Sequence, residues 1–269
     1  MKQSKIEKFI ARTGLTIADL EQFLKPKDFK PKIVIPYSSR HYKFAIVSDT
    51  HLCDKHCAVN ELRDFYRRIK KMGITEVVHA GDLGAGFGVY RGQIQDLIVC
   101  GFDDQRKYIV EHYPQMNGIK TYFISGNHDF STIDNAGANL CAAVAEKRKD
   151  LVFLGDYNAT VRLNGMKIML QHGAKGQPYA MSYHLQKYVE KLGSGRKPQI
   201  YVLGHYHSAL YMFYRNIHTF LPGCFQRANA FTVRLGLPEC IGAWIIECEV
   251  LNDSYNTIRS ITKTFIAYY

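Results

Sequence analysis

Short apolar runs alternate with longer amphipathic stretches in the first half of the chain. The run at 44–48, Phe-Ala-Ile-Val-Ser, has the length and composition of a buried strand. A helix is predicted after it, because Leu62, Phe65 and Ile69 recur at helical spacing and Gly73 can end the helix. The same alternation continues with strands and helical stretches at 76–80, 94–112, 120–124 and 135–147.

The second half of the chain is richer in strand-like runs. They lie at 151–154, 160–163, 167–171, 200–203, 210–214, 219–221, 243–249 and 257–264. Asn164-Gly165 between two of these runs is a strong hairpin signal, and 181–192 is predicted to be helical. Strands and helices in alternation, followed by hairpins, predict a layered α/β sandwich of two packed sheets with helices on the outside.

Residues 1–40 form a basic extension ahead of a main domain predicted at 41–269. Short helices are expected at 4–12 and 17–24, and their spacing resembles a helix-turn-helix. Residues 1–43 hold ten Lys or Arg and four Asp or Glu, a balance of +6 within a chain total of +11. This distribution favours a polyanionic partner such as nucleic acid, with a basic solubilising tail as the alternative.

Potential metal ligands follow five of the predicted strands, at the points where loops leave the sheet edge. They are Asp49 and His51, then Asp82, then Asn127 with His128 and Asp129, then His172, then His205 and His207. Carboxylate and imidazole groups suit manganese, iron, zinc or nickel. Two cations roughly 3.5–4 Å apart need a bridging carboxylate, and Asp82 is the natural candidate.

The series Asp-x-His, Gly-Asp, Gly-Asn-His-Asp, His-Gly and Gly-His-x-His lies in this order between about residues 43 and 210. It resembles the calcineurin-like metallophosphoesterase superfamily. The resemblance implies a four-layer α/β/β/α sandwich of two mixed sheets with flanking helices. It also implies two divalent metal ions, manganese in the first place, with iron, zinc or nickel as alternatives.

The resemblance further assigns a role to each motif residue. One metal would be held by Asp49, His51 and His207, and the other by Asn127, His172 and His205. Asp82 would bridge both metals. His128 would lie near the scissile phosphate without binding metal, and Asp129 would orient it from behind.

Departures from the family pattern narrow the branch. Residues 81–86 read Gly-Asp-Leu-Gly-Ala-Gly and lack the Gly-Asp-x-Val-Asp-Arg-Gly of the protein Ser/Thr phosphatase branch. Ala85 stands where purple acid phosphatases carry a tyrosine ligand. The resemblance is therefore closest to the DNA-repair exonuclease and phosphodiesterase branches.

The leading hypothesis is a phosphodiesterase or nuclease that acts on nucleic acid through a hydroxide activated by two metals. One alternative is a phosphodiesterase or phosphatase for small nucleotides or other soluble phosphoesters. Another is a nucleic-acid-binding protein with a vestigial metal site. Candidate substrate contacts are Tyr90 and Arg91 in a glycine-rich loop and Arg227 further along the chain.

Membrane and export signals are missing from the sequence pattern. No stretch approaches the roughly 18 apolar residues of a spanning helix, and the basic start of the chain lacks the apolar run of a signal peptide. The seven cysteines are scattered and odd in number, as expected for reduced thiols in the cytoplasm. The pattern leaves the oligomeric state open.

Overall fold

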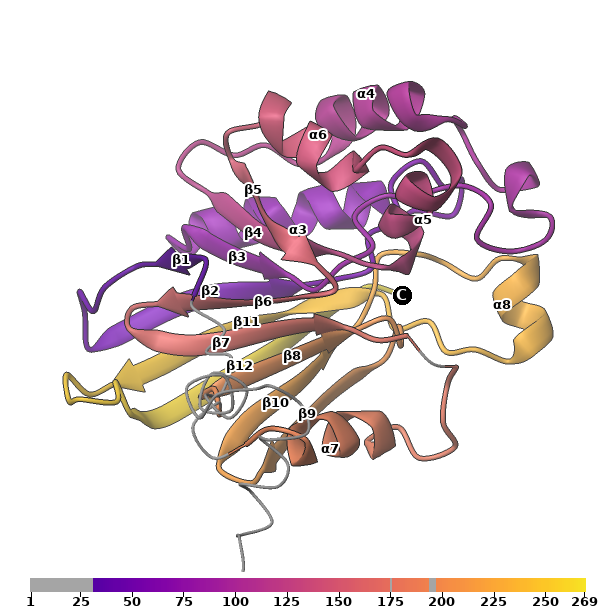
Figure 1. Ribbon diagram of the computed structural model, residues 1–269. Helices are drawn as coiled ribbons and strands as arrows, with labels where there is room; N and C mark the ends of the chain where they lie inside the picture. The colour runs from indigo at the N-terminus through magenta and orange to yellow at the C-terminus, as the bar shows by residue number, and fades with distance from the viewer. Residues whose placement is uncertain (1–30, 175, 194–196) are drawn as a thin grey trace, which may run out of the picture.

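A computed structural model describes residues 31–269 except 175 and 194–196. Two six-stranded sheets pack face to face, and helices lie on their outer sides (Figure 1). This arrangement confirms the predicted four-layer α/β/β/α sandwich. The predicted helices at 4–12 and 17–24 lie outside the described residues, so their fold stays a prediction.

The first sheet has the order β12-β11-β2-β3-β4-β5. Its parallel part consists of β2 (His41–Val47), β3 (Glu76–His79), β4 (Lys120–Ser125) and β5 (Leu151–Asp156), and β11 (Gly242–Val250) pairs antiparallel with β2 and with β12 (Ile258–Ala267). The central strand β2 is apolar on both faces, because Phe44 and Ile46 face the other sheet while Ala45 and Val47 face the helices. Burial on both faces explains its uninterrupted apolar run.

The second sheet has the order β1-β6-β7-β8-β10-β9. Its strands are β1 (Ile33–Val34), β6 (Asn158–Leu163), β7 (Met166–His172), β8 (Ile200–Gly204), β9 (Ala209–Tyr214) and β10 (Ile217–Pro222). Asn164 and Gly165 both have positive φ in the turn between β6 and β7, which confirms the predicted hairpin. β1 precedes residue 41, yet it pairs with β6 and belongs to this sheet.

The helices cover the two outer faces unequally. The first sheet is covered by α3 (Val59–Lys71), α4 (Phe102–His112), α5 (Asn127–Ala136) and α6 (Leu140–Lys147), and the second sheet by α7 (Tyr183–Glu190) (Figure 1). Three apolar cores correspond to the three interfaces between layers. Among the described residues, none of the helices has the length and apolar character needed to cross a bilayer.

Two helical predictions differ from the structure. The stretch at 94–112 forms the short 3-10 helix η1 (Gln93–Gln95) and, after a gap, α4. The stretch at 135–147 divides between α5 and α6, because Gly137 ends the first helix at φ +66° and Asn139 caps the second by accepting from Ala142 N at 3.0 Å. The pattern also missed α8 (Ala230–Leu235), which is short and has no buried residue to reveal a helical period.

Candidate metal centre

The predicted metal ligands meet at one end of the sandwich, where strands of both sheets end. Val47 pairs in register with His79, and His79 with Phe123, so the residues after β2, β3 and β4 leave the first sheet at the same level. In the second sheet, His172 at the end of β7 pairs with Gly204 at the end of β8. Each sheet therefore delivers part of the cluster.

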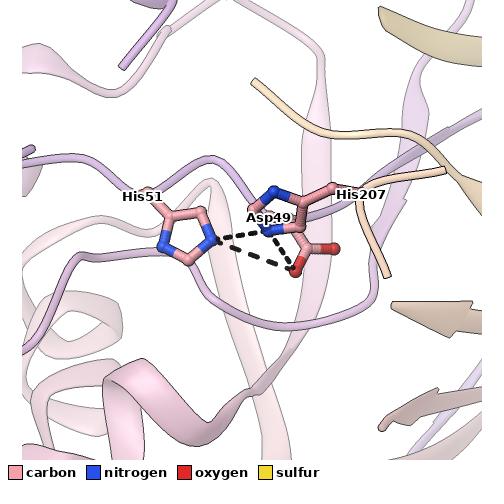
Figure 2. Close-up of side chains that lie close together, drawn as sticks. All are labelled: Asp49, His51 and His207. Atoms are coloured by element: carbon pink, nitrogen blue, oxygen red, sulfur yellow. Dashed lines mark hydrogen bonds and ion pairs between the residues drawn. The ribbon is translucent and has the colours of Figure 1, made fainter. Parts of the chain in front are cut away.

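The first set of donor atoms comes from Asp49, His51 and His207 (Figure 2). The Nε2 atoms of His51 and His207 face each other at 3.1 Å. The Oδ1 atom of Asp49 lies 3.5 Å from Nε2 of His207 and 4.0 Å from Nε2 of His51. Two imidazole nitrogens at this distance need a proton or a cation between them, because their lone pairs otherwise repel.

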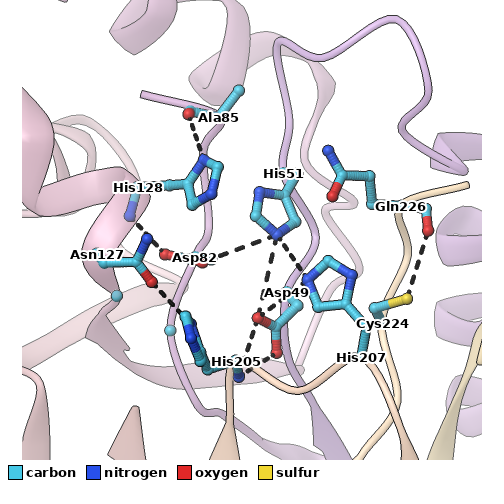
Figure 3. A network of polar contacts seen from close by, with 12 residues as sticks. Asp49, His51, Asp82, Ala85, Asn127, His128, His205, His207, Cys224 and Gln226 are labelled. Carbon is cyan, nitrogen blue, oxygen red and sulfur yellow. Dashed lines mark hydrogen bonds and ion pairs between the residues drawn. The ribbon is translucent and has the colours of Figure 1, made fainter. Parts of the chain in front are cut away.

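The second set comes from Asn127, His172 and His205, and Figure 3 shows Asn127 and His205 facing each other. Oδ1 of Asn127 lies 3.1 Å from Nε2 of His172 and 2.9 Å from Nδ1 of His205. The carbonyl of Ala80 can only accept a hydrogen bond, so Nδ1 of neutral His172, at 2.8 Å from it, carries the proton. The neutral ring thus has a lone pair on Nε2 that is directed at the cluster. In the protonated ring Nε2 carries the second proton; burial opposes this form, but the carboxylates of Asp82 and Asp49 outweigh burial and raise the pKa of His172 to about 9.

Asp82 connects the two sets. Its Oδ2 lies 3.7 Å from Nε2 of His51 in the first set and 3.2 Å from Nε2 of His172 in the second. All seven predicted ligands thus lie together, and the described residues that could hold a metal in groups of three or more are all found here. The mixture of imidazole, carboxylate and amide oxygen fits two divalent cations of borderline softness.

Backbone strain is concentrated at these donors. Positive φ angles occur at Asp49 (52°), His51 (45°), Asp82 (54°), His205 (89°) and His207 (49°). A non-glycine residue in this region costs on the order of 1–3 kcal/mol and persists only where the surrounding fold imposes it. Here the strain turns side chains from five different loop positions toward one point.

Glycines admit the close backbone approaches around the cluster. A Cβ atom at Gly126 would overlap both Oδ1 and the backbone nitrogen of Asp82, and one at Gly204 would overlap the carbonyl oxygen of Ala80. Neither overlap could be relieved by moving the end of a flexible side chain. These two positions therefore require glycine for steric reasons.

Electrostatics inside the cluster keep the carboxylates charged. Burial raises the pKa of Asp82, but the charges of His172 and His128 lower it by a larger amount, so the pKa is well below its usual range. The pKa of Asp49 is also lowered, because the hydrogen bond from His207 and the charge of His172 outweigh burial. Burial and the charge of His172 lower the pKa of His205 to about 4. The cluster thus offers ionised carboxylates together with a neutral imidazole.

His128 lies beside the donors, and its ring is held by the backbone. Its Nδ1 lies 2.8 Å from the carbonyl oxygen of Ala85, and its backbone N–H donates to Oδ1 of Asp82 at 2.9 Å (Figure 3). The ring of His128 stands edge-on to that of His51, with centroids 4.5 Å apart. Because Nδ1 must donate to a carbonyl, Nε2 is the ring nitrogen left for chemistry.

Asp129, which is expected to orient His128 from behind, binds backbone groups on either side of the cluster. Its carboxylate accepts from the backbone N–H groups of Leu83 (3.0 Å), Gly84 (2.8 Å) and Gly126 (2.9 Å), so it ties the loop after β3 to the start of α5. The partner of the His128 ring is Ala85, in the loop that Asp129 holds. An orienting effect of Asp129 on His128 would therefore pass through the backbone of this loop.

A pocket of about 280 Å³ opens beside the donors. Tyr90 lines it together with Asp82, Asn127 and His128. Arg91 and Arg227, the other expected substrate contacts, are not among its lining residues, and Arg227 pairs with Glu61 on α3. Two contacts could not be predicted from the sequence: the carbonyl of Ala85 binds the His128 ring, and the side chain of Asn229 donates to the hydroxyl of Tyr90. A backbone carbonyl and a lone asparagine leave no pattern in the chain.

Comparison with known proteins places this geometry in context. A profile of the calcineurin-like phosphoesterase superfamily domain matches residues 42–235. The DNA polymerase II small subunit of Halobacterium salinarum is 24% identical over 294 residues, covering 92% of this chain and 57% of the relative. The protein of the same name from Methanocaldococcus jannaschii is 25% identical over 237 residues, covering 72% and 40%.

Solved structures with a similar fold are more distant in sequence. An archaeal phosphodiesterase is 15% identical with a TM-score of 0.48, covering 84% of this chain and all of that one. Zinc-bound Vps29 from Entamoeba histolytica is 14% identical with a TM-score of 0.44, covering 84% and 99%. The chain spans about half the length of the curated relatives it matches.

Proposed function

Because the chain belongs to the calcineurin-like phosphoesterase superfamily, we propose that it hydrolyses phosphodiester bonds of nucleic acid at this centre. The observation that carries the proposal is the pair of donor sets joined by Asp82, with Nε2 of His128 free beside them. A set this complete also argues against a vestigial site. Buried donors without a metal or a proton between them are costly to keep.

The side chains of the cluster fit two metal ions, and each residue can be assigned to one ion or to both. Asp49, His51 and His207 would hold one, Asn127, His172 and His205 the other, and Asp82 both. When bound, two divalent cations, manganese in the first place, would lower the pKa of a water molecule and neutralise charge on the phosphoryl oxygens. The ionised state of Asp49 and Asp82 prepares the site for such cations.

The chain itself supplies the proton for the leaving group. The Ala85 carbonyl accepts from Nδ1–H and fixes the direction of the His128 ring, so that its imidazolium form can donate the Nε2 proton to the departing oxygen. A positioned acid of this kind contributes about 10²–10⁴-fold to the rate. The contribution falls for a leaving group that needs no proton, such as nitrophenolate.

Nucleic acid is favoured over small esters by two observations. The chain carries a formal charge of +11, which favours association with a polyanion. Relatives that match most of the chain are named as subunits of a DNA polymerase. A phosphodiesterase for small nucleotides is the second candidate, favoured by the small volume of the pocket.

A substrate panel with Mn²⁺ tests the proposal. It contains single- and double-stranded DNA, RNA, cyclic nucleotides and bis(p-nitrophenyl) phosphate, each assayed with wild type, His128→Ala and Asp82→Asn. His128→Ala should keep bound metal but lose about 10²–10⁴-fold in turnover of DNA, with a smaller loss on the nitrophenyl ester. Asp82→Asn should lose metal and all activity.

An exposed histidine on β2 gives the matched control, and His41→Ala should behave as wild type. Wild-type turnover of DNA by His128→Ala would refute the acid role. Metal-loaded protein that cleaves nothing in the panel would refute the hydrolase. If only cyclic nucleotides or the nitrophenyl ester were cleaved, the result would refute nucleic acid as the substrate and support the second candidate, a phosphodiesterase for small esters.

A further inference from the structure

One side of the pocket beside the donors is apolar and takes no part in phosphoester chemistry. It is formed by two segments far apart in the chain, the loop after β3 and the segment of α8. Its members are Val89, Tyr90, Phe231, Leu235, Leu237 and Pro238. The rest of the lining includes the polar donors Asp82, Asn127, His128, His205 and His207, which we call the donor side.

Tyr90 and Phe231 form the centre of this apolar wall. Their rings are stacked at 4.5 Å between centroids with an angle of 18°. The ring of Tyr90 also stands 6.4 Å from that of His128, so the wall begins directly beside the reacting groups. A ligand group that touches the wall is therefore close to any phosphate held over the donors.

Hydrogen bonds fix the wall before a ligand arrives. The hydroxyl of Tyr90 donates to Oδ2 of Asp96 at 3.0 Å and accepts from Nδ2 of Asn229 at 3.2 Å. Asn229 is itself held, because its Oδ1 accepts from the backbone N–H of Thr232 at 2.9 Å as the cap of α8. Such preorganisation lowers the entropy lost on binding.

The charges of the lining residues restrict what can occupy the wall. Among the described residues that line the pocket, none is Lys or Arg, and Asp82 is the one that carries a carboxylate. The guanidinium carbon of Arg234 lies over the Phe231 ring, 6.0 Å from its centroid, so a cation adjoins the wall without lining the pocket. A flat, uncharged group joined to the phosphate by a short link fits both sides, and a nucleoside has this form.

We propose that Tyr90 and Phe231 form the surface against which a base of the substrate lies while its phosphate occupies the donor side. This assignment rests on the proposed function and adds the residues that select a nucleotide from other phosphoesters. Contact between a base and aromatic side chains is tolerant of sequence, because every base has a π-face. The wall therefore selects for the presence of a base and discriminates weakly between bases.

The test compares an intact oligodeoxynucleotide with the same strand carrying one abasic nucleotide at its 3′ or 5′ end. Wild type and Phe231→Ala are assayed on both strands with Mn²⁺. We expect Phe231→Ala to raise KM for the intact strand about tenfold with little change in kcat, because the contact contributes to binding alone. On the strand whose abasic position occupies the wall, wild type and variant should have the same KM.

Two further variants keep the test independent of folding. Phe231→Tyr retains the ring and should restore the KM of wild type. Val233→Ala on the same helix changes a side chain that is 68% exposed and does not line the pocket, and it should have no effect. Equal KM values of wild type and Phe231→Ala on intact DNA would overturn the proposal, as would an equal loss on intact and on both abasic strands.

Failure of the wall and failure of the proposed function give different results. If the protein hydrolyses bis(p-nitrophenyl) phosphate and DNA but shows no base effect, only the proposed base contact with Tyr90 and Phe231 is refuted. If no ester is cleaved, the proposed function fails, and the same strands are then compared by fluorescence anisotropy. In that experiment, equal Kd values for intact and abasic strands would overturn the wall, and a weaker Kd for an abasic strand that disappears in Phe231→Ala would support it.

Discussion

At the scale of single residues, Asp129 shows how a buried charge can organise a site without touching the reacting atoms. Burial, together with the charge of Asp82, raises its pKa to about 7, while three backbone N–H groups act in the opposite direction. These three bonds join the loop that carries Ala85 to the start of the helix that carries His128. We therefore expect the position of the His128 ring to depend on Asp129 through these backbone hydrogen bonds.

Asp129→Asn tests this dependence. The amide presents an NH₂ group where the carboxylate accepts from N–H groups, so at least one buried donor loses its partner, at a cost of about 1–3 kcal/mol in the free energy of unfolding. Displacement of His128 should lower kcat on DNA by up to about 100-fold, with bound metal retained. Asp134→Asn, an exposed change on the same helix, is the control, and unchanged kcat in Asp129→Asn would exclude the positioning role.

At the scale of elements, the Gly-Asn-His-Asp motif differs from its prediction. The sequence placed it in a loop after a strand, and in the structure it forms the start of α5. The helix begins at Asn127, directly after Gly126, so the chain turns from strand to helix within the motif itself. The turn brings the Gly126 backbone against Asp82 and directs the first residues of the helix at the cluster. The direct change from strand to helix thus places both Asn127, a proposed metal ligand, and His128, the proposed acid, at the cluster.

Gly126→Ala should separate these elements. The added methyl group would overlap Oδ1 and the backbone nitrogen of Asp82, so either α5 or the loop after β3 must shift. We expect loss of at least one metal, measured by elemental analysis of the purified protein, and destabilisation of about 1–3 kcal/mol from overpacking. Gly193→Ala, which meets open space, should change neither, and full metal content in Gly126→Ala would show that the contact can relax.

At the scale of the whole molecule, the metal centre joins the two sheets. Asp49, His51, Asp82 and Asn127 follow strands of the first sheet, whereas His172, His205 and His207 follow strands of the second. Each donor set contains residues from both sheets. Away from the centre, apolar packing holds the sheets together, with Ile46 and Val78 on one side and Ile168 and Leu170 on the other.

Metal binding should therefore stabilise the fold as a whole. A ligand at 100 times its Kd contributes about 2.7 kcal/mol to the free energy of unfolding. For a domain of this size that corresponds to a rise in Tm of roughly 5–10 °C, measured by calorimetry on metal-free protein with and without Mn²⁺. Asp82→Asn should lose most of this rise, and an equal rise in both proteins would show that Mn²⁺ binds elsewhere.

The sequence by itself determined the order of the layers, the hairpin at Asn164-Gly165 and the seven donors that meet at the end of the sandwich. These features are local or periodic: an apolar run such as that of β2 reports burial on both faces, and each donor follows a strand directly. The pattern did not predict the boundary between α5 and α6, because a single Gly137 decides it and helical periodicity continues past it.

Only the tertiary structure decided how those donors approach one another and what surrounds them. The contacts of Ala85 with His128, of Asp129 with three N–H groups, and of Tyr90 with Phe231 join residues from different elements. Positive φ at five ligands, and the close packing at Gly126, likewise follow from the surrounding fold. Such features depend on distances through space, and one sequence records only distances along the chain.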